Sequence, residues 1–225
     1  MIDSYDKLPV GTYVEALAIA RDYDGEERNL RLLSLLSGES IDDLMDRPFV
    51  EVGTDMKRLA FLAKEPTPQK TRKEYHVGPF TLVPTLDYKK VTTAQYVDFQ
   101  GFTKEPSEDG HVVEVLSCFL VPKGATYCDG SYDPADVQKA VREAMCVADA
   151  ASLHAFFFGR YSASMRRLLT SLTATLSRLP ESPQKEALQA KATSLRTALR
   201  RAGDGSPAWT PFRLLSGLLG TTSGR

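Results

Sequence analysis

Apolar residues recur at helical spacing in the first 65 residues of the chain. Groups spaced by three or four positions alternate with polar capping residues, and Gly38 and Pro48 end two of them. This period is typical of amphipathic helices, and short helices persist only when they pack on one another. Thr12, with Glu15 three positions later, forms a capping-box pattern. We therefore predict four short helices, at residues 12–20, 25–37, 41–45 and 49–64.

A stretch with a two-residue period follows a polar, proline-containing linker after residue 65. Residues 73–77 and 80–84 alternate between apolar and polar positions around the Gly78-Pro79 turn, which indicates a β-hairpin. Pro84 marks an edge strand or a strand end. Because a lone hairpin is marginal in water, we expect it to lie against the helices or against another chain.

Helical spacing returns after the hairpin. It predicts helices at residues 92–100 and 111–120, separated by an acidic loop, and a break at residues 121–124. Asp133-Pro134 is a strong helix start, because Asp caps the helix and Pro suits the first helical position. From there the small apolar residues keep helical spacing as far as Ala155, which predicts one long helix.

The C-terminal part contains two further apolar stripes, at residues 165–179 and 188–199. The proline-bearing loop between them is short, so we predict an antiparallel helical hairpin. A flexible link then leads to a final apolar peptide. Its apolar side chains are spaced by three, three and four positions, as in a helix that binds a groove on a partner. These candidate partner-binding residues are Trp209, Phe212, Leu215 and Leu219.

These patterns together predict a mainly α protein with a small β-hairpin, of the α+β class. The expected regions are a helical part at 1–65, the hairpin with its helices at 66–158, a basic helical hairpin at 159–202, and a link with the apolar peptide at 203–225. The peptide could dock on another subunit or fold onto the protein's own core. At 42% hydrophobic and 25% charged residues, the composition is that of a globular domain and excludes general disorder.

Charge is distributed unevenly, although the net charge is only −1. Residues 160–225 hold 11 basic and 3 acidic side chains, whereas residues 1–159 hold 17 basic and 26 acidic ones. This asymmetry favours contact between the basic part and an anionic partner, although the two parts could also attract each other or the basic side chains could form a solvated helix face. The candidate anion-contacting residues are Arg166, Arg167, Arg178, Arg196, Arg200 and Arg201.

Catalytic and metal-binding signatures are not found in the sequence. Its three cysteines, at positions 118, 128 and 146, lack metal-ligand spacing, and we expect them to be reduced. Adjacent acidic residues on a helix diverge by about 100°, so they cannot share a proton. For an enzyme, His111 with Glu114 is the best available acid-base pair. We predict no cofactor and no metal, and favour a protein that is not an enzyme.

The order of segments resembles small tailed-phage morphogenesis proteins, in particular tail assembly chaperone-like proteins. The resemblance lies in residues 5–15, in residues 31–44, in the hairpin, and in residues 91–100 and 119–124. It covers the chain to about residue 158. The basic hairpin and the peptide with Trp209 depart from the family pattern.

This resemblance implies a non-enzymatic assembly protein of a phage or prophage, with other phage structural proteins as partners and with self-association. It would act in the host cytoplasm during assembly. One alternative is a structural component of the neck or tail that stays in the virion. Another is nucleic-acid contact through the basic hairpin, which the acidity of the rest of the chain disfavours. A membrane location is not expected, because no apolar run reaches the roughly 20 residues of a span.

Overall fold

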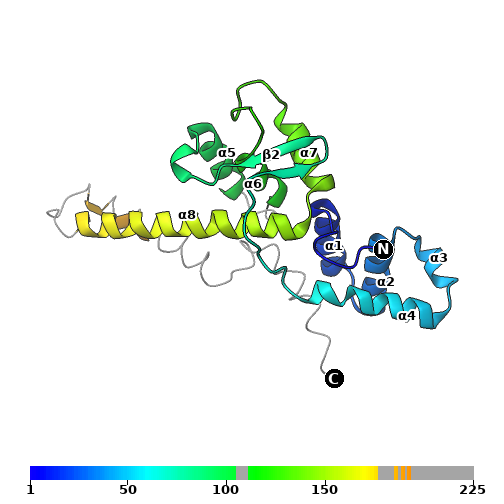
Figure 1. Ribbon diagram of the computed structural model, residues 1–225. Helices are drawn as coiled ribbons and strands as arrows, with labels where there is room; N and C mark the ends of the chain where they lie inside the picture. Colours follow the sequence, from blue (N-terminus) through cyan, green and yellow to red (C-terminus); the bar gives the residue numbers. More distant parts are fainter. Residues whose placement is uncertain (105–110, 177–184, 187–188, 191, 194–225) are drawn as a thin grey trace.

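The structure, a computed structural model, describes residues 1–104, 111–176, 185–186, 189–190 and 192–193 (Figure 1). It is mainly helical with one small sheet, which confirms the predicted fold class in this coarse form. Of the predicted C-terminal hairpin, the first stripe lies in a long helix as far as Leu176, whereas most of the second lies outside the described residues. The elements in chain order are α1 (Val10–Asp22), α2 (Gly25–Ser37), α3 (Ile41–Met45), α4 (Phe49–Arg58), the 3-10 helix η1 (Leu59–Ala63), β1 (Tyr75–Val77), β2 (Phe80–Pro84), the 3-10 helix η2 (Tyr88–Lys90), α5 (Thr93–Lys104), α6 (Val112–Phe119), β3 (Leu120–Pro122), α7 (Pro134–Ala144) and α8 (Val147–Leu176).

The N-terminal helices form where the periodicity predicts them, but the fourth ends as an α-helix at Arg58 and continues as the 3-10 helix η1. The predicted start of α1 is also wrong. The helix begins at Val10, after Pro9, and not at a Thr12 cap. The reason is tertiary, because the Val10 N–H donates to the Met145 carbonyl oxygen at 2.9 Å. A free N–H at the helix start is thereby satisfied by a distant residue, so the helix extends beyond the local capping signal.

The predicted hairpin is confirmed, and it gains a third strand. β2 lies between β1 and β3, both antiparallel to it, with Val83 opposite Val121. Sequence reasoning took residues 121–124 only as a break, because a three-residue strand next to Pro122 has no measurable period. The Lys123 N–H donates to the Thr81 carbonyl oxygen at 2.8 Å. In this register Pro122 occupies a position that is not hydrogen-bonded to β2, so its missing N–H faces the free edge of β3. The edge therefore offers one donor fewer for pairing with another strand.

The single long helix predicted from Asp133 to Ala155 is wrong, because the structure divides it into α7 and α8. Between them Cys146 forms an isolated antiparallel bridge with Pro9. The Val147 N–H donates to the Leu8 carbonyl oxygen at 2.8 Å, beside the bond between Val10 and Met145. Backbone hydrogen bonds to the N-terminal segment thus replace two helical ones, and the apolar period continues through the break because both helices face the same core.

The main core lies where α1, α2, α6, α7 and the first part of α8 meet the sheet. A smaller cluster of Phe99, Val115, Cys118 and Phe119 joins α5 to α6. Phe157 of α8 packs against both clusters and stacks on Phe119, with ring centroids 4.4 Å apart. Figure 1 shows α5, α6, α7 and the sheet on one side of α8, and α1 to α4 at the N-terminal end of α8. Fully buried side chains of the main core include Leu8, Tyr13, Leu32, Leu33, Leu36, Leu82, Leu116, Leu120, Met145 and Leu153.

Helix α8 is 30 residues long and continues through residues 158 and 159, so the second and third predicted regions share one helix. At a rise of 1.5 Å per residue its length is about 45 Å. Among the described residues, no helix is both long and apolar enough to cross a membrane.

We expect His154 of α8 to make the fold less stable in mild acid. Burial disfavours the charged imidazole and lowers its pKa from 6.5 to about 4. Because the unfolded chain binds this proton more readily, the unfolding midpoint should fall as the pH decreases from 6.5 towards 4. In the variant His154→Leu, the unfolding midpoint measured by thermal melts should change less with pH in this range. If the midpoint of this variant changes with pH as steeply as that of the wild type, other groups cause the pH dependence.

Candidate functional site

The sequence-predicted site residues are only partly placed by the structure. The four apolar residues of the C-terminal peptide lie outside the described residues, as do Arg178, Arg196, Arg200 and Arg201. Arg166 and Arg167 lie on α8. The described part of the chain shows two other features that could bind a partner or ligand: an exposed apolar patch on α3 and α4, and a cavity beside the sheet.

The exposed patch consists of Met45, Phe49 and Val50, and we call it the Phe49 patch. Their exposed fractions are 69%, 88% and 78%. Sequence periodicity did not reveal it, because Phe49 has the same helical phase as Val52 and Met56, which pack against the core. The difference is one of position, since the first turn of α4 lies at the outer end of the molecule (Figure 1). Exposed apolar side chains that gather in one place typically mark an interaction surface.

Exposed acidic side chains flank the Phe49 patch in the sequence. Asp42 and Asp43 occupy the first turn of α3, where the helix dipole favours negative charge. Ser40 caps this helix, its hydroxyl oxygen accepting from the Asp43 N–H at 3.1 Å. Asp46 and Glu51 are also exposed beside the patch. Residues 42–51 therefore combine exposed apolar side chains with exposed acidic ones, which we call the acidic rim of the patch.

Arg47 lies between α3 and α4 and bridges Glu39, which precedes α3, to acidic side chains on α4. Its guanidinium donates to Glu39 at 3.0 Å and to Asp55 at 2.8 Å, and lies 3.7 Å from Glu51. The hydrogen bond from Arg47 holds the pKa of Asp55 below its usual value. Arg47 is the one basic residue among six acids between positions 39 and 55, so the segment stays strongly negative. These bonds orient the turn that presents the patch.

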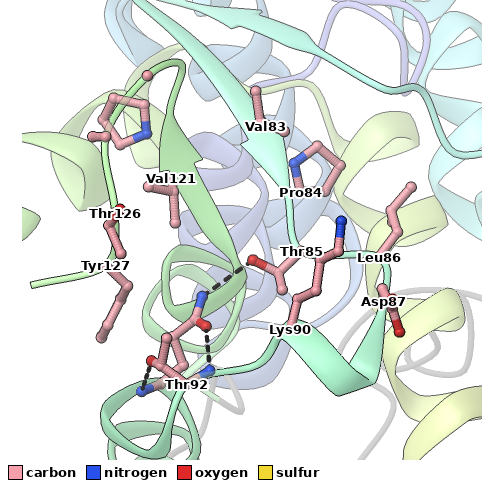
Figure 2. A pocket seen from close by; sticks show the side chains of 14 residues that line it. Val83, Pro84, Thr85, Leu86, Asp87, Lys90, Thr92, Val121, Thr126 and Tyr127 are labelled. Atoms are coloured by element: carbon pink, nitrogen blue, oxygen red, sulfur yellow. Dashed lines mark hydrogen bonds between the residues drawn. The ribbon is translucent and has the colours of Figure 1, made fainter.

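The second feature is a cavity of about 460 Å³ at the end of β2. Figure 2 shows the chain from Val83 to Asp87 on one side of it, Thr126 and Tyr127 on the other, and Thr92 at the start of α5. Its lining is mostly apolar, and Asp87 and Lys90 are exposed.

Gln95 is the buried polar residue of this cavity, and its side chain is engaged in holding the fold. Its Oε1 accepts from the Thr92 N–H at 2.9 Å, and its own N–H donates to Thr92 Oγ1 at 3.2 Å. This is a capping box at the start of α5. The Nε2 group donates to Thr85 Oγ1 at 3.2 Å and to the Cys118 carbonyl oxygen at 2.9 Å. Both amide hydrogens are thus used to join α5 to β2 and α6.

Tyr127 closes one side of the cavity. Its hydroxyl donates to Asp98 Oδ2 at 2.8 Å, and burial, with this hydrogen bond, raises its pKa so that it stays protonated. Burial also raises the pKa of the nearby Cys118 thiol to about 12, which makes it a poor nucleophile. The cavity therefore offers a mostly apolar surface with neutral hydrogen-bonding groups, together with the exposed charged side chains of Asp87 and Lys90.

The acid-base pair considered from the sequence has other contacts. Glu114 Oε1 lies 3.6 Å from Arg142 Nη2, and the His111 ring centroid lies 5.9 Å from that of Phe102. Within the described ranges, no group of three or more metal-ligating side chains is present. The three cysteines are free in the structure. Cys146 lies between α7 and α8 and not within the single long helix predicted there.

Comparison of the chain with protein-family models, with curated proteins and with solved structures found no match.

Proposed function

We propose that this chain is a non-enzymatic assembly protein that acts by protein–protein contact. The observation that supports the proposal is the Phe49 patch, where three apolar side chains within six residues stand largely in solvent. Fully burying side chains of this size contributes about 1.5–3 kcal/mol each. The acidic rim adds selectivity for a basic partner surface, because complementary charges speed association and exclude wrong partners.

The partners proposed from the resemblance are structural proteins of a tailed phage. Acting as a tail assembly chaperone, the chain would bind them in the host cytoplasm and leave before the particle is complete. As a neck or tail component it would stay in the particle. Nucleic-acid contact has less support, because the acidic rim of the patch repels phosphate groups.

Capture from cells that carry the encoding phage or prophage tests this proposal. The full-length tagged chain should retain tail, portal or capsid proteins, identified by mass spectrometry. The double change Phe49→Ser and Val50→Ser, which we call the patch variant, should lose most of them, because it removes the apolar centre. The control is Val97→Ser, which changes a side chain that is 59% exposed on α5.

Two outcomes would contradict the proposal. Equal capture by the patch variant would show that the partners bind elsewhere, and the absence of phage structural proteins from the wild-type sample would remove the phage assignment. Immunodetection in purified particles separates the chaperone from the virion component, since only the latter stays bound.

A further inference from the structure

The same chain contains a segment whose charge is opposite to that around the Phe49 patch. The patch is apolar at its centre and lies in a segment with six acids and one base at positions 39–55. Residues 160–225 have the opposite balance, with 11 bases and 3 acids. A surface of one sign and a segment of the other attract each other across several ångströms of water, which raises the rate of encounter.

The basic part also carries apolar side chains suited to the patch. In residues 207–219 the apolar positions recur at the spacing of one helix face, with Trp209 and Phe212 as the largest side chains. Arg213 lies within this segment, and Arg200 and Arg201 precede it. Aromatic side chains and arginines are the groups that most often carry binding energy at interfaces. The segment thus matches the patch in both polarity and charge.

The arrangement of the fold favours contact between two copies. The patch lies at one end of the molecule, and α8 leads the chain away from it over about 45 Å to Leu176 (Figure 1). The chain therefore leaves this helix at the end opposite the patch. A second copy placed head to tail brings its patch to that end.

We propose that residues 207–219 of one copy dock on the Phe49 patch of a second copy. The proposal rests on the proposed function in one respect, that the patch is a protein-binding surface, and it names the partner as the same chain. Because the two contacting surfaces differ, the interface is heterologous, and repeated contacts give a ring or an open filament. Such growth suits a protein that takes part in assembly.

The test measures self-association of the purified full-length chain by light scattering over a range of concentrations. Wild-type protein should grow from the 24.8 kDa monomer to larger species as concentration rises. The patch variant alone and a segment variant, with Trp209→Ala and Phe212→Ala, should each stay monomeric, with association weakened about ten-fold or more. Raising the salt concentration above about 0.1 M should weaken wild-type association, because salt screens the exposed charges.

Mixing the two variants is the decisive step. The patch variant keeps its segment and the segment variant keeps its patch, so one intact interface remains and the mixture should give a dimer. The control Val97→Ser should associate like the wild type, and thermal melts should show both variants folded.

A monomeric wild type at all concentrations, a mixture that stays monomeric, or association retained by either variant would overturn the proposal. A segment variant with a lowered unfolding midpoint and a monomeric wild type would show docking on the chain's own core, which also overturns it. These results concern self-association only. Capture of phage proteins by a monomeric chain would leave the proposed function standing, and an associating chain that captures none would remove the phage assignment alone.

Discussion

Replacing Gln95 with alanine should lower the free energy of unfolding by about 2–4 kcal/mol, because each buried group left without its partner costs about 1–3 kcal/mol. The groups that lose Gln95 are the Thr92 N–H, the Thr85 hydroxyl and the Cys118 carbonyl oxygen. Gln95 is only 2% exposed. Denaturant unfolding measures the change directly. For a chain of this size the melting temperature should fall by roughly 4–16 °C.

Two matched variants show whether the loss of stability comes from the bonds that join α5 to β2 and α6 or from the cap of α5 alone. Thr92→Ala removes only the cap of α5 and should cost about 1 kcal/mol. Gln138→Ala makes the same chemical change as Gln95→Ala at a half-buried position on α7, and should stay within about 0.5 kcal/mol of the wild type. A Gln95→Ala cost no larger than that of Thr92→Ala would contradict the role of Gln95 in joining α5 to β2 and α6.

The second large effect is expected at Gly11, where α1 crosses α7. A Cβ atom at this position would lie 2.8 Å from the Arg142 carbonyl oxygen and 2.8 Å from Arg142 Cγ. The side chain can move, but the backbone oxygen cannot without shifting α7. Gly11→Ala should therefore destabilise the protein by about 1–3 kcal/mol, the usual cost of overpacking. Chemical denaturation followed by circular dichroism measures it.

Gly53 on α4 supplies the control, because a Cβ atom there meets no other atom within 4 Å. Gly53→Ala should raise stability by about 0.5–1 kcal/mol, since alanine favours the helix. Opposite signs for the same substitution would confirm that the close approach of α1 to α7 decides the effect. A neutral or stabilising Gly11→Ala would mean that the two helices separate without cost.

Sequence patterns predicted little of the candidate site. The sequence directed attention to the C-terminal peptide and the basic hairpin, which lie mostly outside the described residues. It did not single out Phe49, because a helical period assigns a residue to a face but does not say where the core beneath that face ends. The cavity near Gln95 was missed for a related reason, since Val83 and Tyr127 are 44 positions apart and meet only in the fold.

By itself, the sequence determined the local elements: the helices of the first 63 residues, the hairpin around Gly78-Pro79, and the start of α7 at Asp133-Pro134. These depend on side-chain period, caps and turns, which act over a few residues. Only the tertiary structure decided the early start of α1, the break at Cys146 and the third strand β3. In each case a backbone group is satisfied by a partner distant in sequence, and no local pattern records that choice.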